Sequence, residues 1–150
     1  MLFENNSAHL SDFIRLNEEW IETYFSLEAH DRELAANPGG VIDAGGYIFT
    51  LAVDDHVIGA CALFKETEGV FEIARMAVSP AQQGKGYGHE LMQACLAKLR
   101  ALNAKKAYIV SHTKLESAVS LYKKYDFETV HLGKHPVYAR ANIVLERHAF

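Results

Sequence analysis

The sequence predicts a single domain of the mixed α/β class. The apolar residues follow a helical period up to Ala36 and a strand-like period from Gly46 onward. After three expected strands, helices and strands alternate, an order typical of a mixed α/β fold. The 150 residues, 49% of them hydrophobic, suit one globular domain over residues 1–150 with a sizeable core.

The N-terminal part predicts a short strand and two amphipathic helices. Met1–Glu4 is the candidate strand, and Ser11 or Asp12 is expected to cap the first helix. That helix places Phe13, Leu16, Trp20, Ile21 and Tyr24 on one stripe. The second helix is expected over Leu27–Ala36, because Asn37-Pro38-Gly39-Gly40 is a strong stop signal.

The rest of the chain predicts a hairpin followed by alternating elements. The hairpin strands are expected at Tyr47–Val53 and Val57–Phe64, and the polar link Lys65–Gly69 leads to a third strand at Val70–Val78. Later elements are a helix over about His89–Leu102, a strand at Ala107–Ser111, a helix at Lys114–Tyr125, and strands at Phe127–Leu132 and Ala139–Arg147.

A glycine-rich turn joins the third strand to the next helix. Gly84, Gly86 and Gly88 fall within five positions. Such a turn points free backbone N–H groups, at the positive end of a helix dipole, toward an anion such as phosphate. A Walker loop is excluded because Lys85 is followed by glycine, and a G-x-G-x-x-G fingerprint fails at His89. The pattern that stands is Gln83-x-x-Gly86-x-Gly88.

This pattern resembles the pyrophosphate loop R/Q-x-x-G-x-G/A of the GNAT family of acetyl-CoA-dependent N-acetyltransferases. Ser111–Phe127 is similar to a second family motif, S-N-x-x-L-x-x-A-x-x-L-Y-x-x-x-G-F, and matches it at Leu115, Ala118, Leu121, Tyr122 and Phe127. Over essentially the whole chain, the resemblance implies the GNAT fold, in which helices flank a twisted mixed sheet that is splayed near its centre to admit the pantetheine arm.

Two residues depart from the second motif. Asp126 replaces the usual glycine, but aspartate tolerates the left-handed conformation, so the helix end should survive. His112 stands where asparagine is common and leaves open any side-chain hydrogen bond from that position.

The resemblance implies acetyl-CoA as cosubstrate and assigns its contacts. Backbone N–H groups of Gly84, Lys85, Gly86, Tyr87 and Gly88 are expected to bind the pyrophosphate, with added charge from Lys85. Gln83 would close the loop or donate to phosphate. Met76, Ala77 and Val78 match the strand that pairs with the pantetheine amides, and a backbone N–H near Met76 is the expected oxyanion donor.

Amine acetylation needs a base, because an alkyl amine of pKa about 10.4 is almost fully protonated at neutral pH. Glu72 is the candidate, acting directly or through water. Strand alternation puts Glu72, Ala74, Met76 and Val78 on one face unless a bulge intervenes. The match of Tyr122 implies a general acid beside the CoA sulfur.

The acceptor is expected to be a primary amine on an unidentified small molecule, peptide or protein. The fold usually builds its acceptor pocket from the first helices and the closing hairpin, here Trp20, Tyr24, Glu28, Asp31, Tyr138 and Arg140. Glu28 and Asp31 share a helical face, which is either a solvated surface or an acidic wall for a cationic amine.

Composition excludes several other classes. A net charge of −4 offers no basic surplus for nucleic acid or an anionic membrane, and neither a transmembrane run nor a signal peptide is expected. Cys61 and Cys95 are expected to be buried thiols in a reducing cytoplasm. The eight scattered histidines predict no metal site. A homodimer, a non-catalytic CoA-binding sensor and a different nucleotide-phosphate binder stay open as alternatives.

Overall fold

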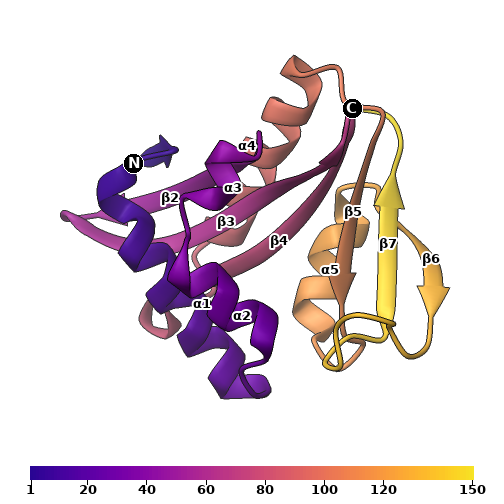
Figure 1. Ribbon diagram of the computed structural model, residues 1–150, viewed down its shortest axis with the longest axis horizontal. Helices are drawn as coiled ribbons and strands as arrows, with labels where there is room; N and C mark the ends of the chain where they lie inside the picture. The colour runs from indigo at the N-terminus through magenta and orange to yellow at the C-terminus, as the bar shows by residue number, and fades with distance from the viewer.

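The computed structural model describes residues 1–150 and shows a twisted β-sheet with helices on both faces (Figure 1). The strands are β1 (Leu2–Glu4), β2 (Tyr47–Val53), β3 (His56–Thr67), β4 (Val70–Val78), β5 (Lys106–Ser111), β6 (Glu128–Leu132) and β7 (Ile143–Arg147). The helices are α1 (Leu10–Tyr24), α2 (Ala29–Ala36), α3 (Gly40–Asp43), α4 (Tyr87–Ala101) and α5 (Glu116–Lys124). The predicted mixed α/β class with helices flanking a mixed sheet is confirmed.

The sheet is split near its centre, between β4 and β5. The strand order is β1-β2-β3-β4-β5-β7-β6, and β4–β5 is the parallel pair in it. The two strands pair only over Val70–Glu72 and Lys106–Tyr108. Beyond Glu72 they diverge, and Figure 1 shows the gap between their ribbons widening toward the lower end of the view. The splay implied by the family resemblance is therefore present, and it leaves one edge of β4 without a partner strand.

Two apolar clusters cover the two faces of the sheet. The larger one packs residues of α4 and α5, such as Leu91 and Tyr122, against the sheet. The smaller one packs Phe13 and Leu16 of α1 on the other face. Because both faces are covered, β3 is buried continuously from Val57 to Leu63 instead of alternating.

The N-terminal helices differ in detail from the prediction. A 3₁₀ turn, Ser7–His9, precedes α1, and Asn6 caps this turn by accepting a hydrogen bond from the Ala8 N–H (3.0 Å). The helix therefore starts before the caps expected at Ser11 or Asp12. Beyond the predicted stop after α2, a short helix α3 forms, because its two apolar residues pack against the smaller cluster.

The bounds of β3 and β7 also differ from the predicted ones, because tertiary contacts compete with the local sequence pattern. β3 continues to Thr67, through most of the polar residues expected to link it to β4, and the chain turns tightly at Gly69, whose φ is +78°. β7 begins at Ile143 instead of Ala139, because Ala139 and Arg140 bind Glu28, the N-cap residue of α2, and not a strand. At the end of α5, Asp126 adopts φ +66°, as expected for a residue that replaces glycine.

Candidate active site

The glycine loop lies between the end of β4 and the start of α4. Gly84 and Gly86 have φ of +77° and +87°, a left-handed conformation that other residues adopt at a cost. Gly86 immediately precedes the first turn of α4, so the free N–H groups of that turn open toward the loop. Gln83 donates from Nε2 to the Val78 carbonyl (3.2 Å) and braces the loop, one of the two roles expected for it.

A groove of about 770 Å³ runs from this loop along β4 to α5. Its lining includes most of the residues predicted to bind the cofactor: Met76, Ala77, Val78, Gln83, Gly84, Gly86, Tyr87 and Gly88. Lys85 does not line it and instead donates to the Gln82 side chain (3.2 Å). Lys114 and Tyr122 border the groove from the α5 side.

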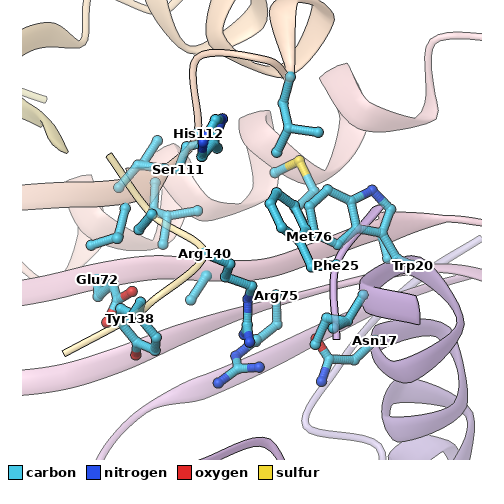
Figure 2. Close-up of a pocket in the computed structure, with 18 of the residues that line it drawn as sticks. Asn17, Trp20, Phe25, Glu72, Arg75, Met76, Ser111, His112, Tyr138 and Arg140 are labelled. Atoms are coloured by element: carbon cyan, nitrogen blue, oxygen red, sulfur yellow. The ribbon is translucent and has the colours of Figure 1, made fainter. Parts of the chain in front are cut away.

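A smaller pocket, about 90 Å³, continues from the inner end of the groove into the split between β4 and β5 (Figure 2). Groove and pocket share the side chains Trp20, Met76, Ala77, Leu115 and Tyr122. Glu72, Arg75, Tyr138 and Arg140 line only the inner pocket. The inner end of a long ligand in the groove would thus lie at the inner pocket, which contains the carboxyl group of Glu72.

Glu72 is the buried acid of this pocket. It lies on β4, is only 8% exposed, and takes part in none of the ion pairs of the chain. Burial raises the pKa of Glu72 to about 7, although the nearby Arg75 opposes the shift and Glu66 adds to it. A carboxyl group with this pKa is partly ionised at neutral pH and is well matched to general base catalysis.

A β-bulge interrupts β4 directly after Ala74. Ala60 pairs with Ala77 and Ala62 with Ala74, so β4 has one extra residue between these pairs. Arg75 adopts φ +58° there, which is unusual for a residue with a side chain.

The bulge reverses the alternation of the strand. Met76 and Val78 pack with the same cluster as Ile73, while Ala77 packs with the opposite one. The shared face expected for Glu72 and Met76 in a regular strand is therefore not formed. Both residues still line the pocket, because the pocket lies along the unpaired edge of β4.

Tyr122 borders both the groove and the pocket from α5. Its side chain is buried in the larger cluster. Burial raises the pKa of the Tyr122 phenol above its usual value, with a smaller contribution from the neighbouring Cys61 and Cys95. The phenol therefore stays protonated and is a hydrogen-bond donor at the junction of the two cavities. The two cysteines are free and buried, with their Sγ atoms 3.6 Å apart.

The residues predicted for the acceptor pocket separate into two groups. Trp20, Tyr138 and Arg140 line the inner pocket, and Tyr24 lines the outer groove. Burial and the nearby Glu72 raise the pKa of Tyr138.

Glu28 and Asp31 line neither cavity and belong to an ion network behind the pocket. The Arg140 guanidinium donates to both Asp31 carboxylate oxygens (2.7 and 2.8 Å) and to Glu28 (3.0 Å), and Arg75 donates to Asp31 as well.

Asp31 therefore belongs neither to a solvated surface nor to an acidic wall open to a cationic amine, the two interpretations that the sequence left open. The Asp31 side chain is fully buried. Burial alone would raise the pKa of Asp31, but hydrogen bonds from Arg140 and Arg75 outweigh it and hold the pKa well below its usual value. The charges of the two carboxylates, Glu28 and Asp31, are balanced by the guanidinium groups of Arg75 and Arg140. These residues lie far apart in the sequence and are brought together by the fold.

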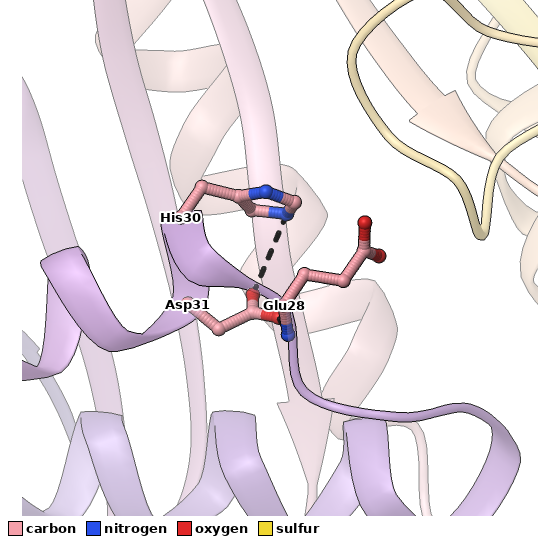
Figure 3. Close-up of side chains that lie close together, drawn as sticks. All are labelled: Glu28, His30 and Asp31. Atoms are coloured by element: carbon pink, nitrogen blue, oxygen red, sulfur yellow. Dashed lines mark hydrogen bonds and ion pairs between the residues drawn. The ribbon is translucent and has the colours of Figure 1, made fainter.

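His30 lies beside this network and completes a cluster with the geometry of three metal donors (Figure 3). Its Nε2 is 3.7 Å from Asp31. The pKa of His30 is lowered mainly by burial. Because both carboxylates already bind guanidinium groups, a cation would have to displace Arg140 and, at Asp31, Arg75 too. The donor set therefore fits an internal ion network better than a metal ion.

Several pocket residues were missed by sequence reasoning. Asn17, Phe25, Arg75, Ser111 and His112 line the inner pocket. Two of them could have been found from the sequence. Arg75 is a charged residue within the apolar run of β4, and Asn17 is a polar residue on the apolar stripe of α1. His112 accepts a hydrogen bond at Nδ1 from the Lys114 N–H (3.0 Å), which answers the question left by its departure from the motif.

Comparison with known proteins identifies the family to which this chain belongs. Its sheet is split between β4 and β5, and a glycine loop precedes α4. The model of the GNAT acetyltransferase family matches residues 12–127. The chain therefore belongs to the GNAT family of acetyltransferases. None of the curated proteins matches it significantly by sequence.

Solved structures share the fold at low sequence identity. A GNAT-family acetyltransferase from Staphylococcus aureus superposes with a TM-score of 0.87 at 15% identity, over 100% of this chain and 99% of the other. An acetyltransferase from Streptococcus agalactiae gives 0.83 at 14% identity, over 99% and 97%. A phosphinothricin acetyltransferase from Sinorhizobium meliloti, solved in complex with AcCoA, gives 0.80 at 19% identity, over 99% and 88%.

No helix in the structure combines the length and the apolar character needed to cross a membrane.

Proposed function

We propose that this protein transfers the acetyl group of acetyl-CoA to a primary amine, within one catalytic domain formed by residues 1–150. The observation that carries the proposal is the direct connection between the groove at the glycine loop and the pocket that contains Glu72. Family membership supports the reaction class, and one structural neighbour was solved with AcCoA.

The groove provides a fitting site for CoA. The loop N–H groups at Gly84 to Gly88, next to the α4 N-terminus, would bind the pyrophosphate. A Cβ added at Gly84 or Gly86 would meet no atom within 4 Å, so the loop surface is open to a ligand. The unpaired edge of β4 from Ile73 to Val78 offers backbone donors and acceptors to the pantetheine amides, like an added strand.

The inner pocket supplies the chemistry. Glu72 takes a proton from the acceptor ammonium, directly or through a water, so that the amine nitrogen can attack the thioester carbonyl. A backbone N–H near Met76, beside the bulge, stabilises the developing oxyanion. As the new C–N bond forms and the C–S bond breaks, the Tyr122 hydroxyl donates its proton to the departing sulfur, and the second proton released by the nitrogen returns to the phenolate through water. Because a thiol has a pKa of about 8.5, this leaving group needs little help and the contribution of Tyr122 is modest.

The direct test is release of free CoA thiol from acetyl-CoA in the presence of a panel of primary amines, followed by detection of the acetylated product. Turnover that depends on the amine supports the proposal. If acetyl-CoA raises the melting temperature and no amine releases thiol, the protein is a CoA-binding sensor instead. Competition by ATP for the same site would indicate a different nucleotide ligand. A cytoplasmic location and a homodimer stay predictions.

A further inference from the structure

Asn17 interrupts the apolar face of α1. The buried residues of this helix are Phe13, Leu16, Asn17 and Ile21, and Asn17 is the polar one among them. An apolar side chain at this position would complete the stripe that packs on the sheet. Folding of α1 therefore gives no reason for an amide here.

The Asn17 amide also has no partner inside the protein. The residue is only 3% exposed, and its Nδ2 atom makes no hydrogen bond. A buried donor left unsatisfied costs about 1–3 kcal/mol. Asn17 lines the inner pocket. Rotation about its χ2 torsion exchanges the positions of the amide oxygen and nitrogen, so either atom can face the pocket. This cost is recovered when a ligand in the pocket provides the missing oxygen.

Arg75 brings a second donor to the same pocket. As the extra residue of the β4 bulge, it lines the pocket with a side chain that is only 8% exposed. Its hydrogen bond to Asp31 engages Nη1, so other N–H donors of the guanidinium stay available. The carboxylate of Asp31 fixes the guanidinium in place, which prepares it for a planar oxygen ligand.

These donors and the proposed base occupy different parts of the pocket. Figure 2 shows Glu72 beside Tyr138 at one end and Asn17 beside Trp20 at the other, with Arg75 between them in this view. An acceptor that placed its amine near Glu72 would bring a neighbouring group to Asn17 and Arg75. We propose that the acceptor is a compact primary amine that also carries a carboxylate, as amino acids do, and that Asn17 and Arg75 bind this carboxylate. The inference rests on the proposed function and names its substrate class.

The charges and the size of the pocket are compatible with a small acceptor that carries a carboxylate. The network of Glu28, Asp31, Arg75 and Arg140 contains two negative and two positive side chains, so its charges balance. The acidic side chain that lines the pocket, Glu72, lies at the opposite end from Asn17 (Figure 2). A guanidinium binds a carboxylate more strongly than a neutral carbonyl. The inner pocket, about 90 Å³, is much smaller than the groove, about 770 Å³, which favours a small acceptor.

The test compares acceptors that differ only in this group. L-amino acids, their carboxamides and the corresponding plain alkylamines are assayed by CoA thiol release, and kcat/KM is expected to be highest for the acids. The ratio of kcat/KM for acid over carboxamide is then compared between the wild type and Asn17→Leu. Comparing ratios cancels the intrinsic reactivity of each amine.

Asn17→Leu is expected to lower that ratio roughly tenfold or more, mainly through KM, because one hydrogen bond to a charged group is lost. Asn17→Asp should lower it further by repelling the carboxylate. The melting temperature of Asn17→Leu should equal or exceed that of the wild type, which separates a binding role from a structural one. Glu22→Leu, on the exposed side of the same helix, serves as the control and should leave the ratio unchanged.

Two results would overturn the inference while leaving the proposed function intact. One is efficient acetylation of plain amines or carboxamides with no preference for acids. The other is an acid preference that Asn17→Leu does not change. Absence of thiol release with every amine would instead contradict the proposed function itself.

Discussion

The replacement Glu72→Gln tests the proposed mechanism most directly, because activity and stability should change in opposite directions. Gln keeps the size of the side chain and cannot accept the amine proton. Loss of a general base typically costs 10²- to 10⁴-fold in rate, so kcat/KM should fall by about this factor near pH 8. Glu66→Gln, which replaces a nearby exposed carboxylate that also raises the pKa of Glu72, is the matched control and should keep most of the activity.

The pH dependence of this comparison follows from the raised pKa of Glu72. The ratio of wild-type to variant kcat/KM removes the ionisation of the amine, which affects both proteins equally. This ratio should rise about tenfold per pH unit below pH 7 and level off above pH 7, because the Glu72 carboxylate forms with a pKa of about 7. Thiol release measured between pH 5.5 and about 9 gives both profiles. A ratio near one, or one independent of pH, would refute the role of Glu72 as base.

The stability effect has the opposite sign. The pKa of Glu72 rises from 4.5 to about 7 on folding, so the folded protein binds this proton more tightly than the unfolded chain. Wild-type stability from this group is therefore full below about pH 4.5 and decreases as the pH rises to about 7. The difference corresponds to about 3 kcal/mol above pH 7, which Glu72→Gln should recover in part. Thermal unfolding at pH 8 should show a variant that melts several degrees higher.

Three further replacements test other parts of the site. Tyr122→Phe should lower kcat less than tenfold while leaving the acetyl-CoA Kd unchanged, because the thiolate leaves readily; a loss of 10³-fold would mean that proton donation by Tyr122 is essential. Gly86→Ala should weaken acetyl-CoA binding, measured by calorimetry, about tenfold, because φ +87° disfavours a side chain by about 1–2 kcal/mol. Gly133→Ala, outside the groove with φ +126°, is its control. Asp31→Asn should lower the free energy of unfolding by about 3–5 kcal/mol in urea titrations, because Arg75 and Arg140 lose their buried partner; an unchanged midpoint would contradict the importance of this network.

Local signals in the sequence predicted the loop that we propose binds the cofactor. The glycine spacing identified the loop, because positive φ at Gly84 and Gly86 is a property of single residues and needs no tertiary information. The helical and strand periods likewise located the main elements, because burial on one face is set by short-range spacing. The left-handed Asp126 was predicted for the same reason.

Tertiary structure decided much of the pocket proposed for the acceptor, although Trp20, Tyr138 and Arg140 were predicted to line it. Asp31 was read as part of an exposed acidic face, because its partners Arg75 and Arg140 are 44 and 109 positions away in the chain. The bulge at Arg75 arises from the pairing between β3 and β4, which the regular apolar pattern of β4 does not reveal. The sequence carries a signal at Asn17, a polar residue on an apolar stripe, but only the structure shows that its amide is buried without a partner. Spacing along the chain therefore determined where CoA is expected to bind, whereas charge pairing and burial between distant segments determined the pocket that we propose for its acceptor.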